Sequence, residues 1–334
     1  MITLGIETSC DETSIALVAD GTSILANIVS SQIEIHRRFG GVVPEIASRK
    51  HLESISPLLR EALSEARIEF RQIDQIAVTM GPGLVGALMV GIATAKALSW
   101  ALKIPLLPVN HIEAHLSAGF LALNKPPSYP FLGLIVSGGH SNLVVADGNR
   151  KFELLGRTLD DAPGELFDKI SRKLSLGYPG GPAIQKTGEG GDPMRYNLPR
   201  PMLGQGFAFS FSGLKTAALN LIRSEGEKLN VCDLCAALQA AVAETFSKKV
   251  VSALEKTGIS RLVVSGGVAA NKLLREYLAK VATKAQIELL IPPPQLCTDN
   301  AAMIASNGFF DASYWENDTT GLSVKADWQM GDNL

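Results

Sequence analysis

The order of predicted elements repeats once along the chain, and this repetition constrains the fold more than any other feature. The first half opens with a β-rich stretch at Ile2–Glu7, a polar turn and a second apolar run at Ser14–Ala19. The second half opens in the same way, with Phe131–Ser137 and Asn142–Ala146. Each pair of short apolar runs predicts a β-hairpin, and alternating strands and helices follow each hairpin. Two hairpin-led α/β halves indicate internal duplication.

Two predicted strands end in the same turn. The segments are Ile135-Val136-Ser137-Gly138-Gly139 and Val263-Val264-Ser265-Gly266-Gly267, and we interpret them as a further sign of the duplication. Glycines leave backbone N–H groups unshielded by side chains, which suits contact with phosphate or ribose. We expect the two turns to face one nucleotide held between two lobes, although Ser-Gly-Gly is also an ordinary turn.

Two of the five histidines, His111 and His115, stand four residues apart. On a helix this spacing puts both imidazoles on one face, and Asn110 is a suitable N-cap for such a helix. A two-histidine edge can bind a divalent metal. The alternative is a pair of polar side chains with ordinary partners, and the local sequence leaves both interpretations open.

Length and charge narrow the class of protein. The 334 residues are too many for one small core and suit two domains or one duplicated architecture. A net charge of −2 argues against nucleic-acid binding by bulk electrostatics, so such a partner would need a local basic patch or a second subunit. A stretch rich in Pro, Gly and Arg, 178–213, predicts an insertion with little regular structure, and the tail after residue 310 is polar and irregular.

The cysteines and the most apolar run point to an intracellular globular protein. Four cysteines are too few for a disulfide scaffold, and no signal peptide is visible, which predicts a reducing cytoplasm. Cys232 and Cys235 form a lone C-x-x-C inside a predicted helix, and we interpret them as packing residues rather than a redox or metal site. The run Leu84–Leu102 nearly reaches bilayer length, but its small residues and Lys96 favour a helix packed inside a domain.

The segment Gly81–Gly86 matches G-x-G-x-x-G, follows a predicted strand and opens a helix, as in dinucleotide-binding folds. Those folds also place an acidic residue about 20 residues further on, where this chain has Leu106, Leu107 and Pro108. We therefore interpret the glycines as sites of close helix packing and not as a nicotinamide site.

Nine sequence blocks, in order over nearly the whole chain, match one family. The blocks are Leu4–Thr13, Gly40–Glu45, Gly81–Gly86, His111–His115, Leu134–His140, Tyr178–Gly181, Phe209–Thr216, Ser265–Asn271 and Cys297–Asn300. In these blocks the chain resembles the TsaD family, the tRNA N6-adenosine threonylcarbamoyltransferases formerly labelled O-sialoglycoprotein endopeptidases. The resemblance implies an α/β, duplicated actin, hexokinase and Hsp70-like (ASKHA) fold, with two lobes and a central nucleotide cleft. We expect an N-terminal lobe at 1–110, a C-terminal lobe at 111–309 that includes the insertion, and an irregular tail at 310–334.

The resemblance also implies transfer chemistry. Members of the family pass a threonylcarbamoyl group from threonylcarbamoyl-AMP to the N6 amine of the adenosine 3′ of the anticodon, in tRNAs that read codons beginning with A. His111 and His115 match two metal ligands of the family and Asp299 matches the third. The implied metal is one divalent ion per subunit, usually Fe2+, with Zn2+ as the alternative. Because an acyl adenylate already carries a good leaving group, the protein mainly has to orient the amine and stabilise developing charge.

Further residues acquire expected roles from the same resemblance. Adenylate-binding positions of the family correspond to Ile135, Val136, Ser137, Gly138, Gly139, Asp168, Gly181 and Asn271. Asp11, on the first hairpin tip, is a weaker candidate for proton handling. Lys215, Arg195 and Arg200 are candidates for contact with tRNA or phosphate. Where many relatives carry an acid this chain has Gln185, which leaves only a neutral hydrogen bond to the threonyl amine.

Each candidate has an ordinary alternative role. Asp168 can cap or pair on its own helix, Asn271 can be a polar residue in the first turn of a helix predicted at 269–281, and Asp299 can belong to an N-cap box of the last helix. Lys215, near a helix start, can simply face solvent.

Three other functions compete with transfer. A metallopeptidase requires a glutamate directly after the first histidine, where this chain has Ile112, while Glu113 points to another face of the helix. A small-molecule phosphotransferase, such as a sugar or acetate kinase, is compatible with the superfamily fold. The third alternative is a nucleotide-binding scaffold without chemistry.

The resemblance implies partners as well. These are tRNA, a TsaB-like paralogue in a heterodimer and a TsaE-like ATPase, while the isolated chain is a candidate homodimer. A separate enzyme would make the adenylate, and the adenylate or ATP is expected in the cleft. No kinase domain is fused and no transit peptide precedes Met1, which favours a bacterial cytoplasmic form without a membrane partner.

Overall fold

The computed structural model describes residues 1–148, 150–312 and 321–332, and it divides into two compact units. Unit 1 comprises Met1–Ser128 and Asp299–Leu334, and unit 2 comprises Tyr129–Thr298. The predicted lobe boundary after residue 110 differs from this division. The physical reason is that helix α4 (His111–Leu121) packs with the C-terminal helix α11 (Ala301–Asp311), which lies on the sheet of unit 1.

The sheet of unit 1 has the strand order β3-β2-β1-β4-β5. Its strands are β1 (Ile2–Glu7), β2 (Glu12–Ala19), β3 (Ser23–Ser31), β4 (Gln75–Gly81) and β5 (Leu106–Asn110). β1, β2 and β3 are antiparallel neighbours, β4 runs parallel to β1, and β5 runs parallel to β4. The predicted first hairpin is confirmed.

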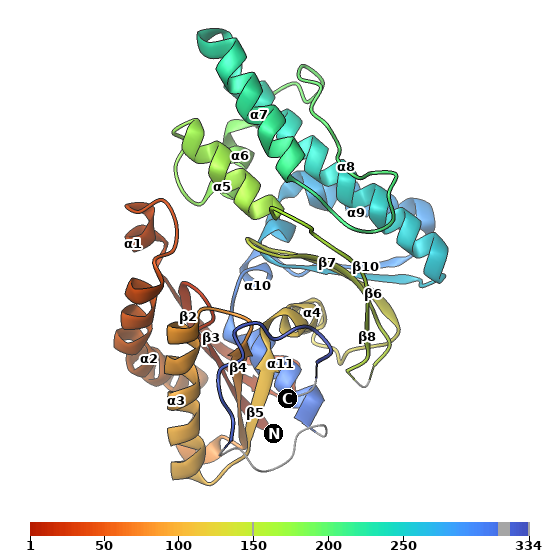
Figure 1. Ribbon diagram of the computed structural model, residues 1–334. Helices are drawn as coiled ribbons and strands as arrows, with labels where there is room; N and C mark the ends of the chain where they lie inside the picture. The colour runs from red at the N-terminus through yellow and green to blue at the C-terminus, as the bar shows by residue number, and fades with distance from the viewer. Residues whose placement is uncertain (149, 313–320, 333–334) are drawn as a thin grey trace. The chain divides into compact units, whose positions relative to one another are not determined.

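Helices cover both faces of this sheet (Figure 1). α2 (Pro44–Ala66) and α3 (Val85–Leu102) lie on one face, and α4 and α11 lie on the other, while the short α1 (Ile33–Arg37) precedes α2. Successive residues of a strand point to opposite faces. On β1, accordingly, Ile6 faces Gly91 of α3, while Gly5 faces α11 so closely that an added Cβ would lie 2.1 Å from the carbonyl oxygen of Ala301.

α3 is long and apolar enough to cross a membrane, and it is the one such helix in the described part of the chain. It packs on β4 and α2, and 33% of its apolar window is buried. A Cβ at Gly86 would lie 2.5 Å from the hydroxyl of Ser48 on α2, and one at Gly83 would lie 2.6 Å from the carbonyl of Ser9. These contacts confirm that the glycines of the G-x-G-x-x-G segment are packing positions.

The sheet of unit 2 repeats the topology of unit 1. Its order is β10-β9-β6-β7-β8, with β6 (Phe131–Val136), β7 (Ser141–Ala146), β8 (Phe152–Arg157), β9 (Arg261–Ser265) and β10 (Glu288–Leu290). β6, β7 and β8 are antiparallel neighbours, whereas β9 runs parallel to β6 and β10 runs parallel to β9. β6 therefore corresponds to β1 and β9 to β4, which confirms the predicted duplication.

The helices of unit 2 enclose an apolar core. They are α5 (Pro163–Lys173), α6 (Gly180–Thr187), α7 (Ser212–Glu225), α8 (Val231–Thr257), α9 (Lys272–Ala285) and α10 (Pro294–Cys297). The segment 178–213 is more ordered than predicted, because it forms α6, with Ile184 buried, and then inserts Phe209 and Phe211 beside Phe246 in the core.

The two Ser-Gly-Gly turns are neighbours rather than equivalent positions of the duplicated halves. They follow β6 and β9, which pair in parallel with Ile135 opposite Ser265 in unit 2. The interpretation of these turns as a repeat signature was therefore wrong, and the strand order carries the duplication instead. Because parallel strands end at the same sheet edge, both glycine turns lie at one edge of one sheet.

The described part of the tail, 321–332, is irregular as predicted but contributes to the core of unit 1. Trp328 is 4% exposed, and the Lys325 amide donates to the carbonyl of Met80 at 2.9 Å. Residues 313–320 and 333–334 of the predicted tail lie outside the described residues.

Candidate metal centre

The side chain of Asn110 links the start of α4 to the C-terminal tail. Its side-chain oxygen accepts from the amides of Ile112 at 2.9 Å and Glu113 at 3.3 Å, which confirms the predicted N-cap. Its amide group donates to the carbonyls of Trp328 and Gln329 in the tail. The first turn of the histidine helix is therefore fixed in position.

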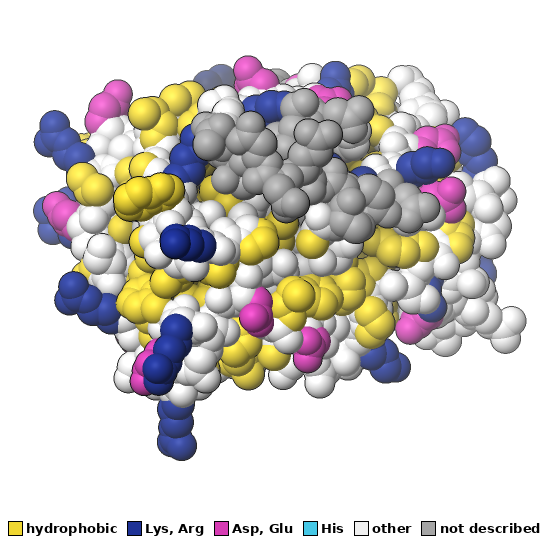
Figure 2. All heavy atoms as spheres, turned by 90° about the horizontal axis from the view of Figure 1, so that it is seen from below, with side chains coloured by type: hydrophobic (Ala, Val, Ile, Leu, Met, Phe, Trp, Pro, Cys, Tyr) yellow, Lys and Arg dark blue, Asp and Glu magenta, His cyan; other side chains and the backbone are white. Residues whose placement is uncertain are grey.

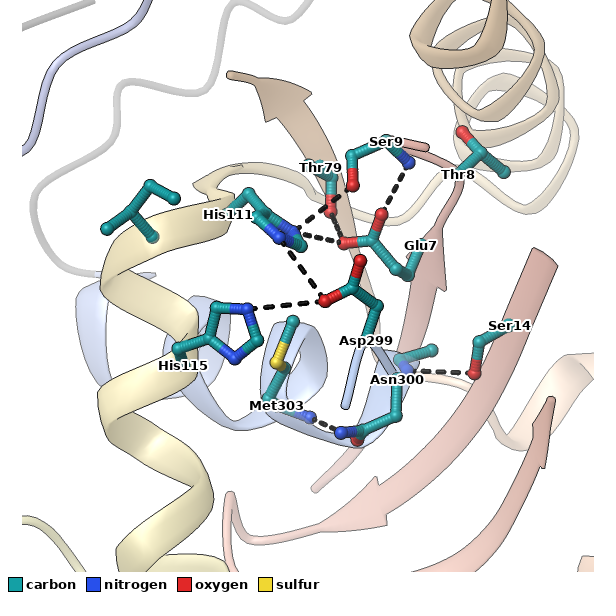
Figure 3. A network of polar contacts seen from close by, with 12 residues as sticks. Glu7, Thr8, Ser9, Ser14, Thr79, His111, His115, Asp299, Asn300 and Met303 are labelled. Atoms are coloured by element: carbon teal, nitrogen blue, oxygen red, sulfur yellow. Dashed lines mark hydrogen bonds and ion pairs between the residues drawn. The ribbon is translucent and has the colours of Figure 1, made fainter. Parts of the chain in front are cut away.

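His111, His115 and Asp299 converge in unit 1, with one ligand atom of each within 4.8 Å of the others. The Nε2 atoms of His111 and His115 lie 3.5 and 3.3 Å from Oδ1 of Asp299 (Figure 3). Asp299 reaches the histidines because it immediately precedes α11, which packs against α4.

These residues fit a divalent metal. His115 is fully buried, and neither of its ring nitrogens hydrogen-bonds to a described residue. Oδ1 of Asp299 lies 3.3 Å from Nε2 of His115 without a hydrogen bond between them. A buried polar atom without a hydrogen bond is costly, and a metal on Nε2 would remove that cost. Ligand atoms that each lie ~2.1 Å from one ion are about 3.0–3.4 Å apart, close to the 3.5 and 3.3 Å that separate the two histidine Nε2 atoms from Oδ1 of Asp299. Two imidazoles and a carboxylate form a donor set that suits Fe2+ or Zn2+.

Asp299 is not the cap of the last helix. The N-cap of α11 is Asn300, whose side chain accepts from the amide of Met303 at 3.2 Å (Figure 3). The amide of Ala301 donates to the hydroxyl of Ser14 on β2. The capping alternative for Asp299 is therefore wrong, and its carboxylate faces the histidines instead.

Glu7, at the end of β1, contacts Nδ1 of His111, the ring nitrogen that does not face Asp299. Its Oε2 lies 2.9 Å from Nδ1 of His111 and accepts from the hydroxyl of Thr79 at 2.7 Å, while its Oε1 accepts from the amide of Ser9 at 2.5 Å. Burial opposes ionisation of Glu7, but the charge of His111 and its hydrogen bond lower the carboxyl pKa. Burial likewise disfavours the imidazolium, yet the charges of Glu7 and Asp299 raise the pKa of His111 to about 9. The site therefore attracts cations.

The first hairpin tip holds a second carboxyl group beside Asp11. Burial and then the charges of Asp11 and Asp299 raise the pKa of Glu12 well above its usual value. The hydroxyl of Ser31 donates to Glu12 at 3.1 Å. Glu12 thus joins Asp11, the residue predicted from the sequence, as a candidate for proton handling.

All three predicted adenylate-binding glycines have open space at their Cβ positions within unit 2. A Cβ at Gly138, Gly139 or Gly181 would meet no atom within 4 Å. Asp168 lies nearby in the chain on α5, and its Oδ1 accepts from the amide of Gly180 at 2.6 Å. Asp168 therefore binds the start of α6 and does not simply cap its own helix.

Asn271 is the N-cap of α9. Its Oδ1 accepts from the amide of Leu274 at 3.1 Å, and its Nδ2 donates to Gln239 on α8 at 2.9 Å. The predicted helix at 269–281 in fact runs from Lys272 to Ala285, because 267–270 form a short 3-10 turn. Asn271 thus precedes the first turn of the helix.

Comparison with known proteins decides the family. Residues 23–306 match the family model described as "TsaD: tRNA N6-adenosine threonylcarbamoyltransferase". The chain belongs to the TsaD family. A protein of that name from Trichlorobacter lovleyi is 51% identical over 336 residues, covering 99% of this chain and 97% of the relative. One from Dictyoglomus turgidum is 49% identical over 335 residues, covering 99% and 100%.

Solved structures confirm the fold class. The activator of 2-hydroxyisocaproyl-CoA dehydratase from Clostridium difficile is similar with a TM-score of 0.55 at 15% identity, covering 94% of this chain and 96% of that one. HypF from T. kodakarensis is similar with a TM-score of 0.62 at 14% identity, covering 95% and 48%. The chain accordingly has the duplicated fold of the actin, hexokinase and Hsp70-like class.

The basic residues that the TsaD resemblance offered for tRNA contact all form ion pairs. Lys215 pairs with Asp161, Arg195 with Asp233 at 3.5 Å, and Arg200 with Glu244 at 2.9 Å. A phosphate would have to compete with these carboxylates, so a role in tRNA binding stays a prediction.

Gln185, the departure from the TsaD pattern, also has a partner. Its Oε1 accepts from the amide of Lys272 at 2.8 Å and so binds the start of α9, next to Asn271. A contact between Gln185 and the threonyl amine stays a prediction.

The older peptidase label of the TsaD family gains no support from Glu113. This residue is 1% exposed, and its Oε1 accepts from the amide of Gly331 in the tail at 2.8 Å.

Cys232 and Cys235 lie within α8 as predicted, and Cys235 is part of the core of unit 2.

Sequence reasoning missed Glu7 and Glu12. A usable signal was present for Glu7, because an acid at the end of a short, otherwise apolar strand requires a buried partner. The identity of that partner required the fold, since His111 lies on another element.

Proposed function

We propose that this chain transfers the threonylcarbamoyl group from threonylcarbamoyl-AMP to the N6 amine of the adenosine 3′ of the anticodon, in tRNAs that read codons beginning with A. The observation that carries the proposal is the convergence of Asp299 with His111 and His115, which lie far from it in the sequence; the three residues match the metal ligands of the TsaD family. Near 50% identity to relatives of that name over the whole chain supports the same reaction.

In this proposal the glycine turns of unit 2 bind the adenylate. Gly138, Gly139 and Gly181 have the open space that a phosphate or ribose needs for contact with backbone amides. Asp168 and Asn271 hold the starts of α6 and α9, so they can position those elements around the ligand as well as contact it. Ile135, Val136 and Ser137 would form the strand end beside the nucleotide.

The transfer exchanges one bond for another. The bond between N6 and the carbamoyl carbon forms, the bond between that carbon and the phosphate oxygen breaks, and AMP leaves. The amine loses a proton in this exchange, and we assign its uptake to the acid pair Asp11 and Glu12. Orientation of the amine relative to the adenylate supplies much of the rate increase.

We propose that His111, His115 and Asp299 hold one Fe2+ per subunit, with Zn2+ as the alternative. When bound there, a divalent metal supplies Lewis-acid stabilisation of ligand oxygens. Elemental analysis of protein purified without oxygen distinguishes the two metals, and absence of both would contradict the assignment.

The proposed partners are tRNA, a TsaB-like paralogue and a TsaE-like ATPase, and a homodimer is the proposal for the chain alone. On the face shown in Figure 2, lysine and arginine side chains lie scattered among acidic and hydrophobic ones. The net charge of −2 of the whole chain supports tRNA binding by an assembly rather than by this chain alone.

We place the paralogue on α3. Val85, Met89 and Trp100 are 54%, 57% and 85% exposed on one face of this helix, and large exposed apolar side chains on one helix face favour a protein partner. A bacterial cytoplasmic location is part of the same proposal.

The decisive experiment combines the purified chain, both partners, ATP, threonine, bicarbonate, the adenylate-forming enzyme and unmodified tRNA. Nucleoside mass spectrometry should detect N6-threonylcarbamoyladenosine. No product from a complete set of active partners would contradict the proposed function, and product formed without this chain would contradict its role.

A further inference from the structure

We propose that Glu7 is a positioning residue that selects the tautomer of His111 required for metal binding. This inference rests on the metal site proposed above and adds a residue that is not itself a ligand. Glu7 lies on β1 and faces Nδ1 of His111, whereas Asp299 faces Nε2 of the same ring (Figure 3).

The hydrogen bonds around His111 define its tautomer. A neutral imidazole has one N–H and one lone pair, and an ionised carboxylate only accepts hydrogen bonds. Oε2 of Glu7 lies 2.9 Å from Nδ1 of His111, so Nδ1 must carry the hydrogen. When the ring is neutral, as a metal ligand must be, Nε2, which lies 3.5 Å from Oδ1 of Asp299, carries the lone pair on the side where His115 also points. This is the tautomer that a metal on Nε2 requires.

Hydrogen bonds fix the conformation of the Glu7 side chain. It is fully buried, and its Oε1 accepts from the backbone amide of Ser9 while its Oε2 also accepts from the hydroxyl of Thr79. A backbone amide can only donate, so the carboxylate is fixed by β1, β4 and the tip of the first hairpin. The result is a rigid acceptor for Nδ1 of His111.

Charge balance favours the same arrangement. Glu7 and Asp299 carry two negative charges beside the two imidazoles, and a divalent cation would neutralise both. Buried charges are tolerated when they are compensated at short distance.

Substitution of Glu7 by glutamine tests the tautomer directly. The carbonyl oxygen of glutamine must face the amide of Ser9, because turning it the other way would set two donors against each other. Its NH2 group then faces Nδ1 of His111 and requires a lone pair there, which moves the ring hydrogen to Nε2. Glu7→Gln keeps the shape of the side chain but selects the tautomer that cannot bind metal through Nε2.

The experiment is titration of the purified full-length chain with Co2+ alone, followed by visible absorption and calorimetry. We expect Glu7→Gln to weaken Co2+ binding by roughly 10–100-fold and to alter the Co2+ absorption spectrum. Thr79→Val, which removes the other donor to Oε2 but keeps the His111 contact, should stay within about 3-fold of the original protein. In a His111→Ala background, Glu7→Gln should have no further effect.

Each outcome has a separate meaning. If the original chain does not bind Co2+, the metal site itself is wrong. If the original chain and Glu7→Gln bind Co2+ equally tightly, the positioning role of Glu7 is wrong. The role is also wrong if Glu7→Gln weakens Co2+ binding in the His111→Ala background. Thermal unfolding of the metal-free variants reports folding. If Glu7→Gln does not fold, Glu7→Asp takes its place, because it keeps the charge but withdraws the acceptor from His111, and unchanged affinity in that variant would overturn the proposal.

Discussion

Buried polar side chains in unit 1 form one connected set of hydrogen bonds and ion pairs, so the protonation of each depends on its neighbours. Glu7 accepts from three donors, His111 contacts carboxylates at both ring nitrogens, and Asp299 faces two imidazoles. His115 differs, because both its nitrogens are buried without a hydrogen bond to a described residue. His115 is therefore the side chain of the three ligand candidates that is hardest to explain without a metal.

Replacing His115 by glutamine should abolish stoichiometric metal binding. The change removes one of three ligands, so the loss in affinity should exceed the roughly 10–100-fold effect of an outer partner. Metal content by elemental analysis and tRNA modification by nucleoside mass spectrometry should fall together. His51→Gln, at a buried histidine bonded to Thr13 and the Cys10 carbonyl, is the matched control and should retain metal. Full metal content in His115→Gln would contradict the site.

Asp160 in unit 2 should contribute to the free energy of unfolding at neutral pH and lose that contribution on acidification. Its carboxylate accepts from the hydroxyls of Ser210 and Ser212 and from the amides of Phe211 and Ser212. Burial alone would raise the pKa of Asp160, but these hydrogen bonds lower it. A carboxyl group with a lowered folded-state pKa stabilises the protein above its unfolded pKa of about 3.9, and the contribution disappears as pH falls through the folded-state value.

Asp160→Ala should therefore lower the free energy of unfolding by about 1 kcal/mol at pH 7, a small value because the side chain is exposed. The difference from the original protein should shrink as pH falls below about 4. Urea unfolding at a series of pH values measures both. A difference that grows on acidification would contradict the assigned sign.

Among the elements, the irregular tail matters most for the site. Segment 321–332 crosses the end of β4 and the start of α4, where Asn110 and Glu113 bind it through hydrogen bonds. Gly81 allows this close approach, since an added Cβ would clash with the Lys325 carbonyl. The tail thus supports the first turn of the helix that carries both histidines.

Trp328→Ala should lower the free energy of unfolding by about 3 kcal/mol, because a buried indole is lost from the core of unit 1. Trp100→Ala is the matched control, since Trp100 is 85% exposed on α3, and its effect should stay within about 0.5 kcal/mol. Urea unfolding of both variants provides the comparison. Equal effects would show that Trp328 is not a core residue.

At the scale of the whole molecule, two units share one topology but hold different functional groups. Unit 1 carries the candidate metal ligands and the acid pair, while unit 2 carries the open glycine turns. The equivalent edges of the two sheets have diverged. The turn after β4 in unit 1 packs against the tail through Gly81, whereas its equivalent after β9 in unit 2 packs against β6, where a Cβ at Gly266 would lie 2.4 Å from the carbonyl oxygen of Val136.

The exposed face of α3 should determine association with the TsaB-like paralogue. Met89→Lys or Trp100→Glu should weaken the heterodimer by about 30-fold or more, the loss typical of an interface hot spot, without loss of stability. Isothermal titration calorimetry measures the affinity. Leu123→Glu, at an apolar residue that is 43% exposed elsewhere in unit 1, should leave it unchanged. Unchanged affinity in both α3 variants would place the partner elsewhere.

The sequence by itself determined the local structure. Alternating apolar runs predicted both hairpins, and Asn110 with the spacing of His111 and His115 predicted a capped helix with both imidazoles on one face. These features depend on residues within a few positions of one another, so local periodicity and capping chemistry are sufficient to find them. The family resemblance added Asp299 to the histidines.

Only the tertiary structure decided which distant groups meet. It separated Asp299 from helix capping, which Asn300 performs, and it placed both Ser-Gly-Gly turns on adjacent strands of one sheet. It also paired Glu7 with His111. These outcomes depend on strand order and helix packing, which arise from burial of side chains summed over a whole unit. No short stretch of sequence specifies that sum, and the partner of a buried carboxylate is therefore known only once the chain is folded.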